Sequence, residues 1–259
     1  MTVSASVRER WSSISTNVGD LKSDRVVAVL EQQILSGAFA PGTTLPIESE
    51  LCEILGVSRT VLRDAVRALV ARGLLTVRQG RGTVVPEPTD EAFANAMVAL
   101  LSRSALTMGE VMEARATIET LLVRLAADAG TEEDWEDLER AHHALGDAVA
   151  MSDEMAASSA HATFHARILQ ATHQPALTLM LTPMNKVALF TGAASVRRGS
   201  MEDWDVEAHR SILDALKLRD AEAAEAAMRE HFAVLARSTV YQELLDRPFA
   251  KAYFNQSSE

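Results

Sequence analysis

The feature that most constrains this fold is a series of short helices followed by a hairpin in residues 24–86. Apolar residues recur at helical spacing in three segments, each closed by a glycine: 24–36, 48–55 and 59–72. Ser58 stands where an N-cap is expected for the third segment. Two β-prone runs, 74–78 and 83–85, then flank the sequence QGRG, which is typical of a hairpin. This order of elements predicts a winged helix-turn-helix domain over residues 21–86.

Charge is distributed unevenly along the chain. The whole chain has a formal net charge of −11, but residues 56–86 contain six arginines and one aspartate, a net charge of +5. From residue 87 onward there are 15 basic and 28 acidic residues, a net charge of −13. A basic segment joined to an acidic body predicts that the first binds DNA and that the second has another task.

The second helix of a helix-turn-helix presents its first residues to the base edges of the major groove. Arg59 and Arg63 lie four positions apart, so they share one face of that helix. Ser58 and Thr60 stand at the helix start, where hydroxyls and free backbone amides favour phosphate. The alternative is an arginine face that is only solvated.

The hairpin tip offers a second contact with DNA. Gly80 and Gly82 would let the backbone approach the duplex closely, and Arg81 between them could enter the minor groove. The tip therefore predicts a wing that reaches the DNA beside the recognition helix.

From residue 90 onward the pattern is helical and carries no strand signal. A capping box is expected at Thr107, Thr131 and Asp134 are expected to open the next helix, and another helix is expected from Pro175 to about residue 194. We therefore expect a mainly α protein in which a C-terminal antiparallel all-helical bundle follows the winged helix-turn-helix. The remaining expected parts are a mobile extension, a linker, the bundle and a loose tail: 1–20, 87–92, 93–245 and 246–259.

Composition narrows the setting of the protein. The chain has one cysteine, Cys52, which excludes an internal disulfide framework and suits the reducing cytoplasm. It has no apolar run of membrane-spanning length, and residues 1–15 lack the apolar core of a signal peptide. We expect a cytoplasmic protein that does not bind a membrane.

The sequence HATFH places His161 and His165 one helical turn apart, and His209 and His231 fall on two later helices. In an antiparallel bundle, side chains from three helices can point into one cavity. Three or four neutral imidazoles there would bind a divalent ion such as zinc, nickel or copper. The alternative is that these histidines are scattered. His142 and His143, on an acidic helix, are expected to be solvated.

The N-terminal segment LPIESELCEILGVSRTVLRDAVRALVARGLLTVRQGRGTVV resembles the DNA-binding domain of the GntR family of bacterial transcription regulators. The resemblance implies operator contacts by residues of the second helix and the wing: Ser58, Arg59, Thr60, Arg63, Gln79, Gly80 and Arg81. Ser49 departs from the family, because many members have a DNA-contacting arginine there. We expect an altered operator preference.

The C-terminal part is similar to the helical ligand domain of the FadR-like (FCD) subgroup. The similarity rests on five stretches: EARATIE at 113–119, FH at 164–165, HQPAL at 173–177, HRSILDAL at 209–216 and AEAAMREHF at 224–232. It implies a metal held by His165, His209 and His231, with His161 in place of the usual aspartate. This exchange removes a negative charge and a hard oxygen, so zinc or nickel is favoured over manganese-like ions.

The same resemblance implies that Arg115 meets a carboxylate effector. A guanidinium recognises a carboxylate through two parallel hydrogen bonds, so the chemistry fits. The alternative is an ion pair on the helix surface between Arg115 and Glu119, four positions later.

Together these features predict a ligand-responsive transcription repressor that binds double-stranded operator DNA as a homodimer. A small organic acid at the metal pocket is the expected signal. One alternative is that the metal itself is the signal or is only structural. Another is a metal-dependent enzyme fused to a DNA-binding head. The chain has no HExxH motif, and no acidic residue stands next to His165 in the sequence, so we expect no catalysis.

Overall fold

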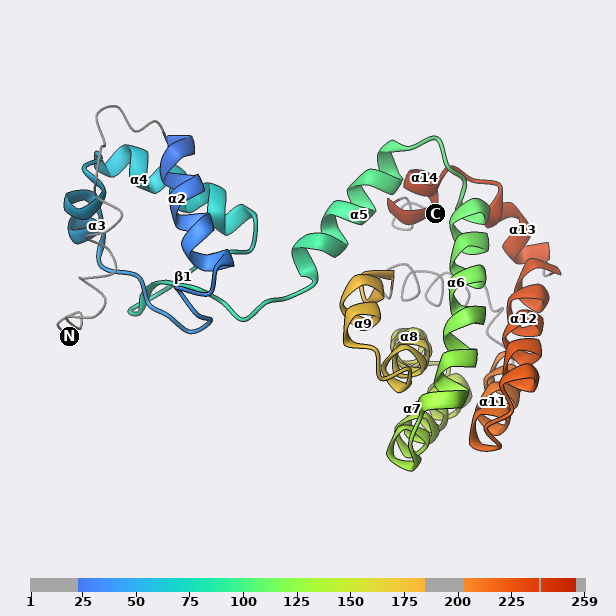
Figure 1. Ribbon diagram of the computed structural model, residues 1–259. Coiled ribbons are helices and arrows are strands. Elements are labelled where there is room, and N and C mark those ends of the chain that lie inside the picture. Colours follow the sequence, from blue (N-terminus) through green and yellow to red (C-terminus); the bar gives the residue numbers. More distant parts are fainter. Residues whose placement is uncertain (1–22, 185–202, 238, 255–259) are drawn as a thin grey trace. The chain divides into compact units, whose positions relative to one another are not determined.

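The computed structural model describes residues 23–184, 203–237 and 239–254 (Figure 1). These residues form helices and one two-stranded sheet, which confirms the mainly α prediction. Contacts between residues divide the chain after Ala92 into two units, each described by itself below. The predicted extension 1–20 lies outside the described residues. None of the described helices combines the length and hydropathy that crossing a bilayer requires.

The N-terminal unit contains three helices: α2 (Ser23–Leu35), α3 (Glu48–Leu55) and α4 (Arg59–Ala71). Helices α2 and α3 both pack against α4, and the apolar faces of all three enclose one core. Leu30, Leu51 and Leu62 are buried there. The Ser58 hydroxyl accepts a hydrogen bond from the amide of Val61, so the predicted cap is confirmed.

The predicted hairpin is formed by β1 (Thr76–Arg78) and β2 (Gly82–Val84), which pair antiparallel. Gly80 and Gly82 have φ angles of 75° and 80°, a left-handed conformation that favours glycine. The amide of Leu45 donates to the carbonyl oxygen of Thr83 at 2.8 Å, which ties the hairpin to the loop before α3.

The C-terminal unit is built from helices. Those described are α5 (Glu91–Arg103), α6 (Met108–Ala129), α7 (Glu132–Ala150), α8 (Glu154–Ala171), α9 (Pro175–Leu181), α11 (Asp203–Lys217), α12 (Ala221–Arg237), α13 (Thr239–Leu245) and α14 (Phe249–Phe254). Thr107 forms the predicted capping box of α6, and Thr131, at the predicted start of α7, forms a capping box as well. The helix expected from Pro175 is described as α9, and residues 185–194 of that expectation lie outside the described residues.

Five long helices of this unit surround a common interior. Helix α6 packs against α8 and α12, while α11 contacts α6, α7 and α12 (Figure 1). Apolar side chains such as Val123, Phe164, Ile212 and Met228 meet in one buried cluster. Residues on the inner faces of α8, α11 and α12 are therefore brought close together although they are far apart in sequence.

The loose tail expected from residue 246 is wrong for the part that the structure describes. The amide of Met108 donates to the carbonyl of Arg247, and the amide of Phe249 donates to the carbonyl of Leu106. Phe249 is fully buried, and its ring stacks on that of Tyr253. The segment is ordered because it pairs with the chain that enters α6 and fills part of the core.

Candidate functional site

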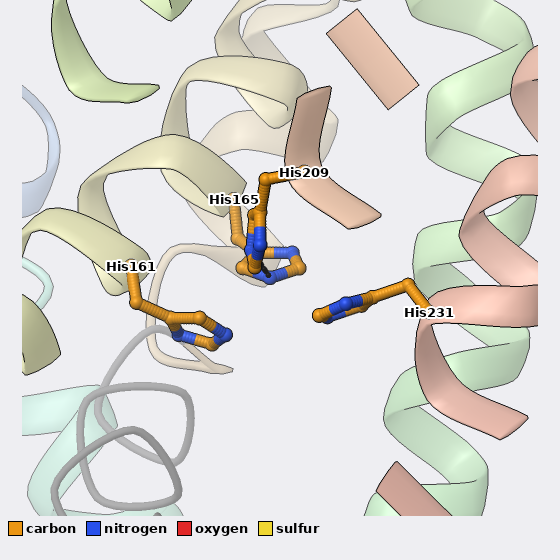
Figure 2. Close-up of side chains that lie close together, drawn as sticks. All are labelled: His161, His165, His209 and His231. Atoms are coloured by element: carbon orange, nitrogen blue, oxygen red, sulfur yellow. Dashed lines mark hydrogen bonds between the residues drawn. The ribbon is translucent and has the colours of Figure 1, made fainter. Parts of the chain in front are cut away.

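Four histidines from three helices meet inside the C-terminal unit. Helix α8 supplies His161 and His165 from successive turns, α11 supplies His209 and α12 supplies His231. Each is at most 4% exposed. Figure 2 shows the four rings converging on one region rather than facing solvent separately. The structure thus brings together all four residues that the sequence singled out as metal ligands.

The spacing of the ring nitrogens suits one metal ion. Each histidine offers a nitrogen, and these four atoms lie within 4.8 Å of one another. The Nε2 atoms of His165 and His209 are 3.3 Å apart. Two nitrogens bound tetrahedrally to zinc at about 2.0–2.1 Å would lie about 3.3–3.4 Å apart. The Nδ1 atom of His161 is buried without a hydrogen-bond partner among the described residues, as expected of a nitrogen reserved for a ligand.

Burial lowers the pKa of His161, His165 and His231 and so favours the neutral form, which is the form that binds metals. Burial and the neighbouring histidines lower the pKa of His161 and of His231 well below the usual value. Burial also outweighs the attraction of Glu119 and lowers the pKa of His165 to about 4. At neutral pH these side chains therefore present lone pairs rather than positive charges, and the donor set fits zinc or nickel.

A buried carboxylate, that of Glu119 on α6, contacts the histidine cluster. Nδ1 of His165 lies in contact with Oε2 of Glu119, and Arg115 Nε donates to its Oε1 at 2.5 Å. Burial alone would raise the pKa of Glu119, but Arg115 and His165 outweigh it and hold that pKa at about 2. No acid stands beside His165 in the sequence, because Glu119 reaches it from another helix.

Arg115 lies in the interior, not on the helix surface. Its side chain is 2% exposed, and its guanidinium carbon stands 5.4 Å from the centroid of the Phe232 ring. The ion pair with Glu119 that sequence spacing offered as an alternative is present. Its expected surface position is wrong, because α6 turns this face toward the bundle core.

His142 corrects a second expectation. It is buried, and its Nε2–H donates to the carbonyl oxygen of Val206 at 3.0 Å, which joins α7 to α11. Burial outweighs this hydrogen bond and lowers the pKa of His142. His143, the next residue, is exposed beside Glu139 as expected.

A pocket of about 270 Å³ lies between α6, α12 and α13. Phe232 and Met112 line it, and none of the four clustered histidines does. The ring of Phe232 contacts His165, so Phe232 separates this pocket from the histidine cluster. The lining is mainly apolar and offers little to hold an acid.

The predicted DNA-contacting residues gather at two exposed places of the N-terminal unit. Ser58, Arg59, Thr60 and Arg63 are exposed on the first turns of α4 and just before it. Gln79, Gly80 and Arg81 form the exposed tip of the hairpin. Within this unit the helix start and the wing tip therefore both offer groups to solvent, as DNA binding requires.

One acidic residue of the motif, Glu48 at the start of α3, contacts two exposed arginines of α4. Its Oε2 accepts from Arg63 Nε at 2.8 Å, and its Oε1 lies 3.8 Å from Arg59 Nε. Glu48 is not among the residues that the sequence predicts to contact DNA. The pairing places both guanidinium groups on one side of α4 before DNA arrives.

Comparisons with known proteins give a match for both the N-terminal and the C-terminal part of the chain. The protein-family model described as "Bacterial regulatory proteins, gntR family" matches residues 22–85. The protein-family model described as "FCD domain" matches residues 110–234. The galactonate operon transcriptional repressor of Escherichia coli (strain K12) is 29% identical over 213 residues, covering 80% of this chain and 91% of the relative.

Two further proteins extend this agreement. An HTH-type transcriptional regulator of Mycobacterium tuberculosis is 35% identical over 214 residues, covering 80% of this chain and 85% of the relative. Among solved structures, a GntR protein of Streptococcus agalactiae aligns with a TM-score of 0.59 at 26% identity, over 83% of this chain and 100% of that one.

Proposed function

The chain belongs to the gntR family of bacterial regulatory proteins and carries an FCD domain. We propose that a small carboxylate, bound at a metal-containing pocket, controls the affinity of this regulator for operator DNA. That it is a DNA-binding transcription regulator follows from the family itself. The observation that carries the proposal is the buried cluster of four histidines.

In this proposal the N-terminal unit reads the operator. Arg59 and Arg63 of α4 would reach base edges in the major groove, while Ser58 and Thr60 would bind phosphate. The wing tip, with Gln79, Gly80 and Arg81, would contact the adjacent groove. Two copies of the chain would place two such units on a palindromic site, with half-sites about one helical turn apart.

The helical unit would hold a divalent ion, with zinc or nickel favoured. His161, His165, His209 and His231 are the proposed ligands. When bound, the ion supplies a buried positive charge that attracts an anion. Imidazole ligands carry no negative charge that would cancel the charge of the ion, which supports an acidic rather than a basic effector.

The proposed effector is a small organic acid, and Arg115 is the proposed partner for its carboxylate. Arg115 places a guanidinium in the interior, and its positive charge contributes, after burial and the neighbouring histidines, to the lowered pKa of His161 and His231, which supports this role. One relative is named for the galactonate operon, and galactonate is itself a carboxylate.

We propose repression as the sign of regulation, in line with that relative, although the Glc operon regulator of Escherichia coli is an activator. The matched relatives are transcription regulators, and we propose no catalytic activity.

A second candidate is a regulator that responds to the metal alone. The observation that favours it is the number of donors, because four nitrogens within 4.8 Å of one another can fill a tetrahedral zinc site completely. Such a site would leave no position for an acid.

The test measures DNA binding by the full chain. Operator fragments are first enriched from genomic DNA, and affinity is then followed by fluorescence anisotropy with and without zinc. Galactonate and other hydroxy acids of two to six carbons are added singly. The proposal expects an acid to weaken binding only when zinc is present. Release by zinc alone would favour the second candidate.

Two variants complete the test. Arg63→Ala should weaken operator binding, whereas His165→Ala should bind the operator and no longer respond to zinc and acid. A His165→Ala protein that responds like the wild type would refute the metal pocket.

A further inference from the structure

Glu119 joins two groups that the proposed sensor uses. Its carboxylate lies inside the bundle, with one oxygen in contact with Nδ1 of His165 and the other 2.5 Å from Nε of Arg115. His165 in turn places its opposite nitrogen, Nε2, 3.3 Å from Nε2 of His209. The contacts therefore run from the guanidinium of Arg115 to the carboxylate of Glu119, then to the imidazole of His165, and from there to the centre of the cluster.

The two nitrogens of an imidazole are linked chemically. When a carboxylate accepts the hydrogen of one nitrogen, the other nitrogen is left with a lone pair, and the plane of the ring is fixed. The negative charge also makes that lone pair a better donor. Glu119 stands where this effect would act on the nitrogen that faces His209.

We propose that Glu119 is a positioning residue for the metal, which fixes the tautomer and orientation of His165 so that Nε2 points to the ion. This inference rests on the proposed function, because it requires the histidine cluster to hold a metal. Its chemistry is that of a divalent ion with nitrogen ligands, supported by one carboxylate outside the ligand set.

Arg115 has a supporting part in the arrangement. A carboxylate this deeply buried needs a cation, and the guanidinium supplies one within hydrogen-bond distance. Removing Glu119 alone would leave Arg115 as a buried cation without that carboxylate. The experiment therefore includes a variant in which both charges are replaced together.

The experiment measures the zinc affinity of the full chain by competition with a chromophoric chelator. Glu119→Gln should bind zinc about 10- to 100-fold more weakly than the wild type. The double variant Arg115→Met, Glu119→Leu should show a loss of the same size, and its helical content is checked by circular dichroism. Glu113→Gln, an exposed glutamate on the same helix, is the matched control and should bind zinc normally.

A spectrum separates positioning from a general structural role. With cobalt in place of zinc, the visible absorption bands report the ligands around the ion. Glu119→Gln should change these bands, whereas Glu113→Gln should leave them unchanged.

The possible outcomes distinguish the inference from its premise. If the wild type binds zinc and both Glu119 variants bind it equally well with unchanged cobalt spectra, Glu119 is only the counter-ion of Arg115 and the inference is wrong. If the wild type binds no zinc, the proposed metal site fails, and the inference fails with it.

Discussion

Zinc should stabilise the C-terminal unit, because its proposed ligands come together only when the chain folds. His165 and His209 are 44 positions apart in the sequence and 3.3 Å apart, between their Nε2 atoms, in the structure. An unfolded chain holds no such site, so binding energy adds to the free energy of unfolding. Free zinc at 100 times its Kd would contribute about 2.7 kcal/mol, less any binding by the unfolded chain.

The size of the unit converts this free energy into a temperature. The unit spans Phe93–Glu259, and for domains of 150–250 residues each kcal/mol shifts Tm by about 2–4 °C. Saturation with zinc at that level should therefore raise the Tm of this unit by about 5–11 °C. The N-terminal unit contains none of the four histidines and should not shift.

The assay is differential scanning calorimetry of the full chain, first treated with chelator and then supplied with buffered zinc. His209→Ala should lose most of the zinc-induced shift, whatever its Tm without metal. His143→Ala changes an exposed histidine outside the cluster and should keep the full shift. A wild-type Tm that does not respond to saturating zinc, or an equal response from His209→Ala, would refute the reasoning.

Three further predictions concern other parts of the molecule. Glu48→Gln frees two arginines of α4 from an exposed carboxylate, so the affinity for a random-sequence duplex, measured by fluorescence anisotropy, should rise by up to about fivefold at low salt. An unchanged or lower affinity would contradict this. Arg63→Ala should weaken operator binding about 5- to 150-fold; an equal loss on random DNA would show a phosphate contact instead. Gly130→Ala would place a methyl group against the buried ring of Trp135. It should lower the stability of the C-terminal unit to urea by about 1–3 kcal/mol, and an unchanged midpoint would contradict the packing.

Local signals predicted most of the secondary structure. Ser58, Thr107 and Thr131 each cap a helix through a hydroxyl and a backbone amide three positions later, so the sequence alone contains the interaction. The hairpin was predictable for the same reason, because Gly80 and Gly82 supply the left-handed turn between β-prone runs.

Burial was harder to predict, because it depends on which face of a helix meets another element. His142 and His143 are neighbours on one acidic helix, yet α11 covers only the first of them. The final segment was expected to be loose, but Phe249 fills the core because the chain before α6 pairs with it.

The histidine site combines a local sequence signal with an arrangement that depends on helix packing. The spacing of His161 and His165 predicts that they share one helix face. Their approach to His209 and His231 depends on how the helices pack, which local spacing does not determine. Sequence spacing indicates Glu119 only as a partner of Arg115, because it cannot show that the same carboxylate reaches a histidine on another helix.

The most direct test of the account is zinc X-ray absorption by the loaded full chain, which reports the atoms around the ion. The account predicts nitrogen ligands at about 2.0–2.1 Å with the outer-shell scattering of three or four imidazoles, and loss of that scattering in His209→Ala. A shell of oxygen atoms without imidazole scattering, or a sulfur at about 2.3 Å from Cys52, would place the ion elsewhere and contradict the account.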